Sequence, residues 1–171
     1  HRATFSHCVP AILQMLLNHP ASAGVDLRGW KVLIGGAALP LGLAREAVER
    51  GIQVTATYGM SETCPIVSVA LPRPELDPQD PEARLNTLIK TGFPTLMVRA
   101  AVLDEQGHSL PPGPAHPGEL VLRSPWLTQG YFRRPEASAQ LWRNGWLHTG
   151  DLARIDEAGY VYIVGRIKEL I

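Results

Sequence analysis

The first third of the chain alternates between helix-like and strand-like patterns of apolar positions. Residues 9–18 carry a proline in the first turn and then place apolar side chains three and four positions apart, which predicts a helix. Short apolar runs at 30–36 and 52–57 predict two buried strands. Residues 40–50 between them predict a second helix, which ends before Gly51. Because a strand, a helix and a strand in this order form a βαβ unit, we expect a parallel sheet here.

The pattern changes after a charged, proline-rich stretch at 72–84, which predicts a surface loop or a connection between subdomains. Beyond it, residues 135–142 predict a short helix, and the other apolar stretches are short, strand-like and separated by turn residues. Four stretches have this character: LMVRAAVLD (96–104), GELVLRS (118–124), WLHTGDLARID (146–156) and YVYIVGR (160–166). Their spacing is typical of a small antiparallel sheet or barrel. We therefore predict an α/β fold, with the end of an α/β subdomain at 1–88 and a β-rich, barrel-like subdomain at 89–165.

Composition excludes several classes of protein. The 171 residues are 45% hydrophobic and 19% charged, which is typical of a globular protein and not of a disordered one. Lys plus Arg and Asp plus Glu both total 16, so the zero net charge indicates neither a nucleic-acid partner nor an anionic membrane. No run of about 18 apolar residues predicts a transmembrane helix, and the start lacks the pattern of a signal peptide.

The cysteines and the two ends of the sequence indicate the cellular compartment and the extent of the chain. Cys8 and Cys64 match no metal-binding pattern, and we interpret them as reduced thiols of a cytoplasmic protein. The sequence begins without an initiator Met and stops inside the apolar and basic pattern GRIKELI. We therefore expect an internal fragment of a longer protein.

The first candidate site is the loop at 35–38, with the sequence Gly-Gly-Ala-Ala, at the carboxyl end of a predicted parallel strand. Ligands of open α/β sheets bind beyond the carboxyl ends of strands. Glycine also lets the backbone approach a ligand closely, and its exposed N–H groups favour anions. A tight strand-to-helix turn without a ligand would have the same residues. The loop is not a Walker loop, because the following Lys-Ser/Thr is absent.

The second candidate site is YGMSET at 58–63, which follows the next predicted strand. Tyr58 offers a flat face for a base, Ser61 offers a hydroxyl, and Glu62 offers a hard carboxylate oxygen that suits Mg²⁺. A helix capping box, in which Ser or Thr starts a helix with an acid in its first turn, is the alternative. Adjacent parallel strands would bring this loop and the glycine loop to one edge of the sheet, which favours binding.

Two further candidates lie near the end of the chain. Asp151 follows a glycine turn, and a carboxylate held there can accept hydrogen bonds from both hydroxyls of a ribose. An ordinary turn aspartate is the alternative, and His148 is given no catalytic role. Arg166 and Lys168 lie near the acid Glu169, and the two cations could reach nucleotide hydroxyls or phosphate. A solvated charge run at a strand end is the alternative.

The order of these segments resembles the adenylate-forming superfamily, which includes acyl-CoA synthetases, luciferases and peptide-synthetase adenylation domains. The blocks that carry the resemblance are GGAALP, YGMSETCP, TGFP, GELVLRSPWLTQGYF, and GWLHTGDL with DEAGYVYIVGRIKEL. The match runs over essentially all 171 residues. Within the superfamily, SPWLTQGYF and CPIVSVALPRP look most like medium- to long-chain fatty-acyl-CoA ligases.

The resemblance implies roles for the residues that follow the second predicted strand. Tyr58 would stack near adenine, and Gly59 and Met60 would lie with it at the nucleotide. Ser61, in a place often held by Thr, would hydrogen-bond the α-phosphate. Glu62 would hold Mg²⁺. Ser61 and Glu62 are therefore the predicted catalytic residues.

The resemblance also assigns residues elsewhere in the chain. Asp151 would bind the ribose hydroxyls, and Arg166 would support the same sugar. Lys168 would lie in a hinge at 166–171, where a mobile C-terminal domain begins. Three residues would line the pocket for adenine and the acyl carboxylate: Gly35, Gly36 and Ala37.

The implied reaction uses ATP, Mg²⁺ and coenzyme A. A carboxylate attacks the α-phosphorus of ATP and gives an acyl-adenylate and pyrophosphate, and a thiol then displaces AMP. The family's phosphate loop and its catalytic lysine are expected before and after this chain, so the chain alone is predicted to be inactive. Two alternatives stay open: an enzyme that adenylates an aryl or amino acid for a carrier-protein thiol, and a non-catalytic nucleotide-binding relative.

Overall fold

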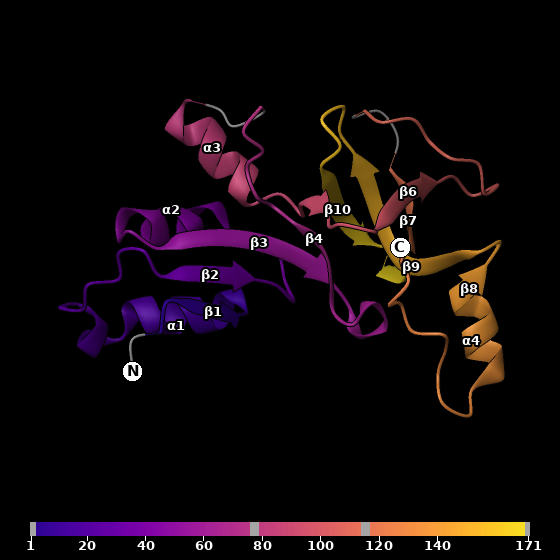
Figure 1. Ribbon diagram of the computed structural model, residues 1–171, viewed down its shortest axis with the longest axis horizontal. Coiled ribbons are helices and arrows are strands. Elements are labelled where there is room, and N and C mark those ends of the chain that lie inside the picture. The colour runs from indigo at the N-terminus through magenta and orange to yellow at the C-terminus, as the bar shows by residue number, and fades with distance from the viewer. Residues whose placement is uncertain (1–2, 76–78, 114–116, 170–171) are drawn as a thin grey trace. The chain divides into compact units, whose positions relative to one another are not determined.

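The computed structural model describes residues 3–75, 79–113 and 117–169 (Figure 1). The chain divides into two compact units, and neither unit is a single continuous segment. The first unit comprises His1–Tyr58 and Val69–Gly92, and the second comprises Gly59–Ser68 and Phe93–Ile171. The predicted boundaries after residues 88 and 165 stay predictions.

Parallel strands form the sheet of the first unit. The strands are β1 (Phe5–Cys8), β2 (Lys31–Ile34) and β3 (Gln53–Gly59). Strand β2 lies between the other two, and Ile34 has Cys8 as its register partner on one side and Ala56 on the other. Ala70, which follows β4 (Ile66–Val69), donates its N–H to the Ala56 carbonyl at 2.8 Å. The predicted parallel sheet is therefore confirmed, whereas β1 is an addition that the sequence pattern did not indicate.

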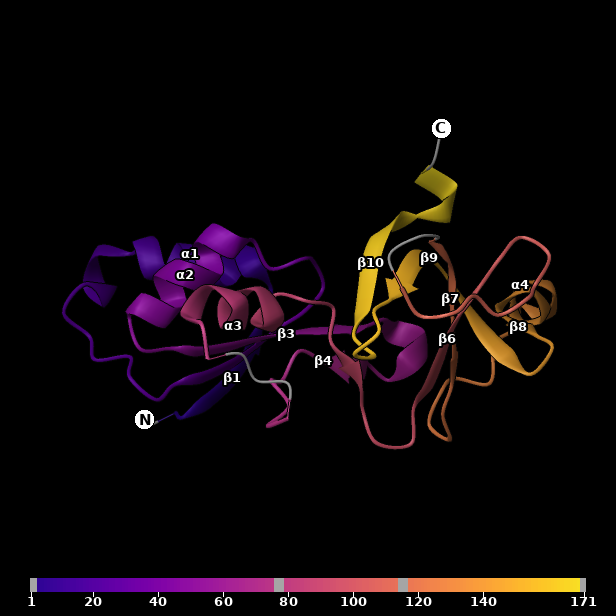
Figure 2. The same ribbon diagram turned by 90° about the horizontal axis from the view of Figure 1, so that it is seen from above.

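Three helices of the first unit lie on one side of its strands (Figure 2). They are α1 (Pro10–Asn18), α2 (Leu41–Glu49) and α3 (Pro81–Leu88), and a short 3₁₀ turn, η1 (Pro20–Ser22), follows α1. Leu13 of α1 and Ala44 of α2 are fully buried in one core with Ile34 of β2. Because α2 connects β2 to β3, the predicted βαβ unit is confirmed.

The predicted loop at 72–84 is wrong where it overlaps α3. The Asp80 carboxylate accepts the N–H of Ala83 at 2.7 Å, which satisfies one of the free donors of the first helical turn. Pro81 occupies the first helical position, where its missing N–H costs nothing. The proline that suggested a loop thus starts a helix, and Leu85 anchors that helix in the core. Residues 76–78 of the predicted loop lie outside the described residues.

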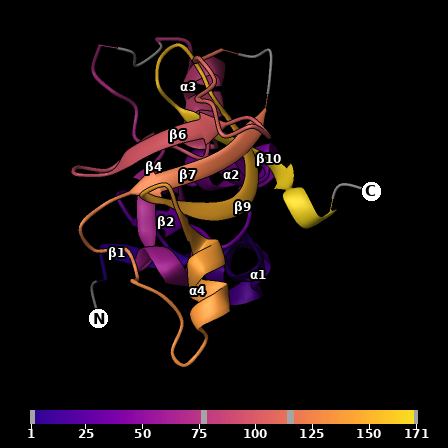
Figure 3. The ribbon, with the colours of Figure 1, turned by 90° about the vertical axis from the view of Figure 1, so that its right-hand side faces the viewer.

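Antiparallel strands form the main sheet of the second unit, as predicted. The long strands are β6 (Arg99–Leu103), β7 (Gly118–Arg123), β9 (Trp146–Ile155) and β10 (Val161–Arg166). Their order is β10-β9-β7-β6, and Figure 3 shows β6, β7 and β9 side by side. The short strand β8 (Trp142–Arg143), which was not predicted, pairs with β9 after helix α4 (Pro135–Leu141).

Apolar side chains of β7 and β9 build the core of this unit. Leu120 and Leu122 of β7 and Leu147 of β9 are each at most 1% exposed. Tyr160 is also buried, and the Phe93 ring meets its ring edge-on at a centroid distance of 5.9 Å. The remaining short elements are η2 (Ser61–Thr63), β5 (Phe93–Pro94) and η3 (Ile167–Glu169).

Among the described residues, no helix has the length and apolar character that crossing a membrane requires.

Candidate functional site

The glycine loop of the first unit is shaped by close contact between strand ends. A Cβ on Gly35 would lie 2.8 Å from Thr57 Oγ1 and 3.2 Å from His7 Nε2, so only glycine fits without displacing them. Gly36 has φ +79°, a left-handed conformation that glycine adopts without strain. Gly36 and Ala37 are exposed, whereas Gly35 is buried. The structure therefore places the predicted loop at the carboxyl ends of β1, β2 and β3.

Tyr58 lies in the first unit too, directly after Thr57 on β3, and is half-buried. Thr57 Oγ1 donates a hydrogen bond to the Ile34 carbonyl at 3.2 Å, which ties the end of β3 to the end of β2. Four predicted nucleotide-binding residues therefore belong to neighbouring strand ends of this unit: Gly35, Gly36, Ala37 and Tyr58.

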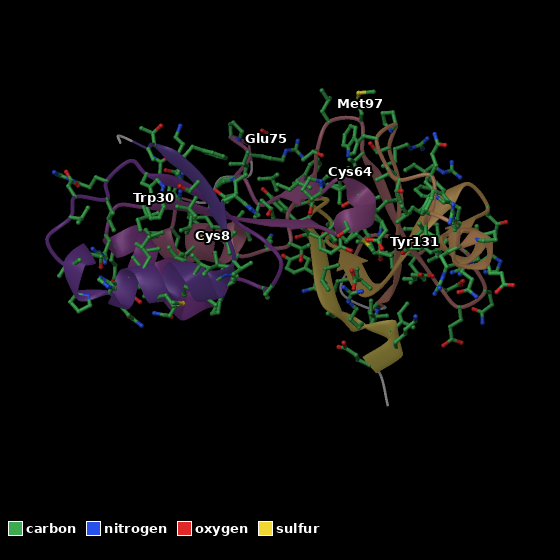
Figure 4. All side chains as sticks on the ribbon, turned by 90° about the horizontal axis from the view of Figure 1, so that it is seen from below. Cys8, Trp30, Cys64, Glu75, Met97 and Tyr131 are labelled. Carbon is green, nitrogen blue, oxygen red and sulfur yellow. The ribbon has the colours of Figure 1, made fainter. Side chains whose placement is uncertain are left out.

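The turn after β3, which opens the second unit, is held by backbone proximity and by one buried hydroxyl. A Cβ on Gly59 would lie 1.7 Å from the Pro65 carbonyl oxygen. The N–H of Met60 donates to Thr63 Oγ1 at 2.9 Å, and Thr63 is fully buried. Cys64, labelled in Figure 4, ends the turn with a left-handed φ of 55°.

These contacts separate two groups of residues within the YGMSET block. Gly59 and Thr63 serve the turn itself, and the hydroxyl that caps it comes from Thr63 and not from Ser61. Ser61 is exposed and Glu62 is half-buried. The capping alternative therefore accounts for Thr63, and it leaves the Ser61 hydroxyl and the Glu62 carboxylate for other contacts.

Glu62 has a hydrogen-bonding partner that the sequence did not reveal. The Tyr131 hydroxyl donates to Glu62 Oε1 at 2.6 Å, and the carboxylate beside it raises the pKa of Tyr131 above its ordinary value. The Thr128 N–H donates to the Glu62 carbonyl at 2.9 Å. Tyr131 lies in the SPWLTQGYF block, which the resemblance singled out without giving this residue a role.

Asp151 lies in a bulge of strand β9. Glu119 of β7 has Leu152 as its register partner, whereas Val121 has His148, so residues 149–151 of β9 face Leu120 alone. Gly150 has φ +70°, which allows the strand to kink. At the bulge, Thr149 Oγ1 donates to the Leu120 carbonyl at 2.8 Å and accepts the Asp151 N–H at 3.1 Å.

A second irregularity brings Arg166 opposite Asp151. The register between β10 and β9 shifts between Ile163 and Gly165, after which Arg166 is the direct partner of Asp151. Arg166 Nε lies 2.8 Å from Asp151 Oδ1. The Asp151 side chain is 4% exposed and that of Arg166 is 55% exposed, so the cation compensates a buried carboxylate from the solvent side. The structure thus brings together two residues that were predicted to act on one sugar.

An open pocket of about 890 Å³ lies wholly within the second unit. Among the predicted site residues, Met60, Glu62, Arg166 and Lys168 line it, whereas Ser61 and Asp151 are not part of its lining. Tyr131, Thr149 and Gly150 also line the pocket. The pocket combines the cationic side chains of Arg134, Arg143, Arg166 and Lys168 with the carboxylates of Glu62, Glu119 and Glu169. Such a composition suits a phosphate-bearing ligand with a bound cation.

The donor set fits Mg²⁺ that arrives with a nucleotide. No group of three or more His, Cys, Asp or Glu side chains that could hold a metal occurs among the described residues. Glu62 supplies a carboxylate, one oxygen of which accepts the Tyr131 hydroxyl. Mg²⁺ keeps several water ligands and is bound through one or two carboxylates together with substrate phosphates.

Comparison with known proteins shows the family to which the chain is similar. A model of the family described as AMP-binding enzyme matches residues 1–132. The chain is 36% identical over 170 residues to a long-chain-fatty-acid–CoA ligase of Thermus thermophilus, with 98% of this chain and 31% of the relative covered. It is 34% identical over 171 residues to a feruloyl-CoA synthase of an Amycolatopsis species, with 99% and 33% covered.

A solved structure shares the fold. O-succinylbenzoate coenzyme A synthetase of Bacillus subtilis, in complex with ATP and a magnesium ion, matches with a TM-score of 0.79 and 30% identity, over 98% of this chain and 32% of that one. The chain spans about a third of the length of the relatives that it matches. The family model, the relatives and the fold confirm the predicted place among adenylate-forming enzymes, and the chain belongs to the family of AMP-binding enzymes.

Proposed function

We propose that this chain forms part of an AMP-forming acid–CoA ligase, in which it binds the nucleotide and the reacting carboxylate. The observation that carries the proposal is the pocket of the second unit. It gathers the Glu62 carboxylate with Arg166 and Lys168, next to the β9 bulge that holds Asp151. The names of the relatives, which are acid–CoA ligases, support the same reaction class.

The reaction has two balanced steps. An oxygen of the substrate carboxylate attacks the α-phosphorus of ATP, the bond from that phosphorus to the bridging oxygen breaks, and pyrophosphate leaves. The coenzyme A thiol then loses its proton and attacks the acyl carbon, and AMP leaves with the electrons of the broken acyl–oxygen bond. The first step needs aligned reactants and neutralised phosphate charge more than it needs covalent help from the protein.

The residues of the second unit provide these functions. Asp151 accepts hydrogen bonds from the ribose hydroxyls, and Arg166 balances part of its charge. The Ser61 hydroxyl donates to the α-phosphate. Glu62 holds Mg²⁺, which when bound neutralises phosphate charge, and Tyr131 orients the Glu62 carboxylate. Lys168 lies at the hinge to a following domain.

The glycine loop of the first unit has a complementary role in this proposal. Gly36 and Ala37, which are exposed, contact the adenine and the acyl carboxylate. Tyr58 provides an aromatic face for the base. Gly35 lets the ends of β2 and β3 approach closely, because it has no Cβ to meet Thr57 Oγ1.

We further propose that a medium- or long-chain fatty acid is the substrate. The support is the SPWLTQGYF block and the long-chain ligase relative. The feruloyl-CoA synthase relative favours an aryl acid as the second candidate. The full-length protein should be assayed for AMP release with octanoate, palmitate, ferulate and mixed amino acids. A kcat/KM for ferulate or an amino acid above both fatty acids would reject the fatty-acid proposal.

The chain by itself is expected not to turn over, because it spans about a third of the relatives' length. Pyrophosphate release should be measured for these 171 residues and for the full-length protein, at equal concentrations. Release by the short chain at the full-length rate would overturn this expectation.

The Glu62→Ala variant of the full-length protein tests the reaction class. Loss of the carboxylate that would hold Mg²⁺ should lower the rate of adenylate formation on the order of 100-fold. The reason is that stabilisation of phosphate charge is a major part of catalysis. Raising the Mg²⁺ concentration should recover part of the loss. Glu157→Ala removes an exposed carboxylate of the same unit and serves as the matched control. Unchanged activity of Glu62→Ala at every Mg²⁺ concentration would reject the proposed function of this site.

A further inference from the structure

Glu119 of β7 lines the pocket of the second unit, and the proposed reaction assigns no role to the contacts that it makes. Its Oε1 accepts the N–H of Gly150 at 3.2 Å. Its Oε2 lies 2.7 Å from His148 Nδ1 and 3.2 Å from Arg143 Nη2. The Glu119 side chain is 19% exposed, so these contacts replace most of its water. One carboxylate therefore joins β7, the β9 bulge and the end of β8.

The β9 bulge explains why a carboxylate is useful at this position. In a bulge the extra residue is left out of the regular ladder, and its polar backbone groups need other partners. The Thr149 hydroxyl bonds the Leu120 carbonyl and the Asp151 N–H, and Glu119 accepts the Gly150 N–H. The charged acceptor strengthens such a hydrogen bond relative to a neutral one, and Glu119 thereby gives the middle of the bulge its partner.

His148 provides an independent observation. Its side chain is 10% exposed, and its Nε2 is buried without a hydrogen-bonding partner among the described residues. An unsatisfied buried polar atom is unfavourable, and an apolar residue would avoid that cost if packing were the only requirement. The remaining nitrogen, Nδ1, faces Glu119 and Arg143. The polar contact of this histidine is therefore the one between Nδ1 and Glu119, the residue that accepts the Gly150 N–H.

We propose that Glu119 is a positioning residue for the ribose-binding carboxylate of Asp151. Glu119 sets the backbone of the bulge through the Gly150 N–H, and Asp151 follows directly in the chain. His148 and Arg143 hold the Glu119 carboxylate in the orientation that reaches this N–H. This inference rests on the proposed function, in which Asp151 binds the ribose of ATP.

The test measures how well the full-length protein distinguishes ATP from 2′-deoxy-ATP. If Glu119 acts through Asp151, Glu119→Ala should lower the ratio of kcat/KM for the two nucleotides by about tenfold, which corresponds to a lost charge-assisted hydrogen bond. The KM for ATP should rise while the KM for the acid stays the same. Glu119→Gln keeps a carbonyl oxygen for the Gly150 N–H, so its ratio should fall only about threefold. Glu157→Ala is the matched control, with the wild-type ratio expected.

The outcomes separate this inference from the proposed function. A merely structural role would lower kcat/KM for both nucleotides equally and leave the ratio unchanged in both Glu119 variants, which would overturn the inference. If Glu119→Ala does not fold, the ratio for Glu119→Gln decides in the same way. Calorimetric binding of AMP and 2′-deoxy-AMP tests the wild-type protein: equal affinities would reject the ribose role of Asp151 and with it the Glu119 inference, whereas the acid–CoA ligase reaction is tested separately by Glu62→Ala.

Discussion

Two turns of the second unit carry candidate site residues, and they are held in place by different forces. The turn after β3 is held by steric fit, because Gly59 lies against the Pro65 carbonyl. Inside the turn, the Thr63 hydroxyl accepts the Met60 N–H. The β9 bulge is held by charged groups, because Glu119 accepts the Gly150 N–H and Arg166 pairs with the residue that follows it. A turn held by steric fit is disturbed by added side-chain volume, whereas a turn held by charged contacts is disturbed by removal of one charged partner.

The difference also concerns what each turn exposes. The turn after β3 buries Thr63, leaves Glu62 half-buried and exposes Ser61. The β9 bulge buries Asp151 itself and leaves its partner Arg166 half exposed. A buried carboxylate loses water on folding and depends on its partners for compensation, so the bulge needs the more elaborate support.

The largest expected effect is that of Gly59→Ala on the first of these turns. The added Cβ would lie 1.7 Å from the Pro65 carbonyl oxygen, and both groups belong to the backbone, so neither can rotate away. We expect a loss of at least about 3 kcal/mol in the free energy of unfolding, at the upper end of overpacking costs. Urea denaturation followed by circular dichroism measures it.

Gly42→Ala is the control for that variant. Nothing lies within 4 Å of a Cβ at Gly42, which is exposed in α2, so alanine should stabilise the helix by about 0.5–1 kcal/mol. Equal effects of the two substitutions would contradict the steric account of the turn.

A smaller loss in the free energy of unfolding is expected from Arg166→Ala at the β9 bulge. The substitution leaves the Asp151 carboxylate, 4% exposed, without its cation. Because the Arg166 side chain is half in solvent, the cost should be about 2 kcal/mol, below that of breaking a fully buried pair. Arg166→Lys keeps the charge and should lose clearly less. A melting temperature of Arg166→Ala equal to that of the wild type would show that the pair contributes no stability.

The smallest effect is expected from Tyr131→Phe, which removes the hydrogen bond to Glu62. The loss in the free energy of unfolding should be about 1 kcal/mol at neutral pH, which is typical of one hydrogen bond. Because the pKa of Tyr131 is raised in the folded state, this stability is fully present below the ordinary tyrosine pKa of 10.0. It is lost as the pH rises through the higher folded pKa, where the phenolate would repel Glu62.

Unfolding of the wild type and of Tyr131→Phe should therefore be compared at pH 7 and at increasing alkaline pH. The two proteins should converge as the pH rises through the folded pKa of Tyr131. A difference that grows with pH would have the wrong sign and would contradict the assigned hydrogen bond.

Sequence periodicity predicted most of the regular elements, and its failures have local causes. Strand β1 was missed because FSHC is short and half exposed, without a continuous apolar run. The start of α3 was missed because proline and aspartate signal loops and helix starts equally well. Strand β8 is two residues long and exists through its pairing with β9, which no local pattern reports.

The sequence by itself determined the βαβ unit, the antiparallel strands and the candidate residues, because apolar periodicity and residue chemistry are local properties of the chain. Only the tertiary structure decided which of these residues meet. The pairing of Asp151 with Arg166 depends on two register shifts between strands, and Tyr131 reaches Glu62 from 69 residues away. The support of Gly150 by Glu119 has the same origin, since strand register is set by packing of the whole sheet and not by the residues at the site.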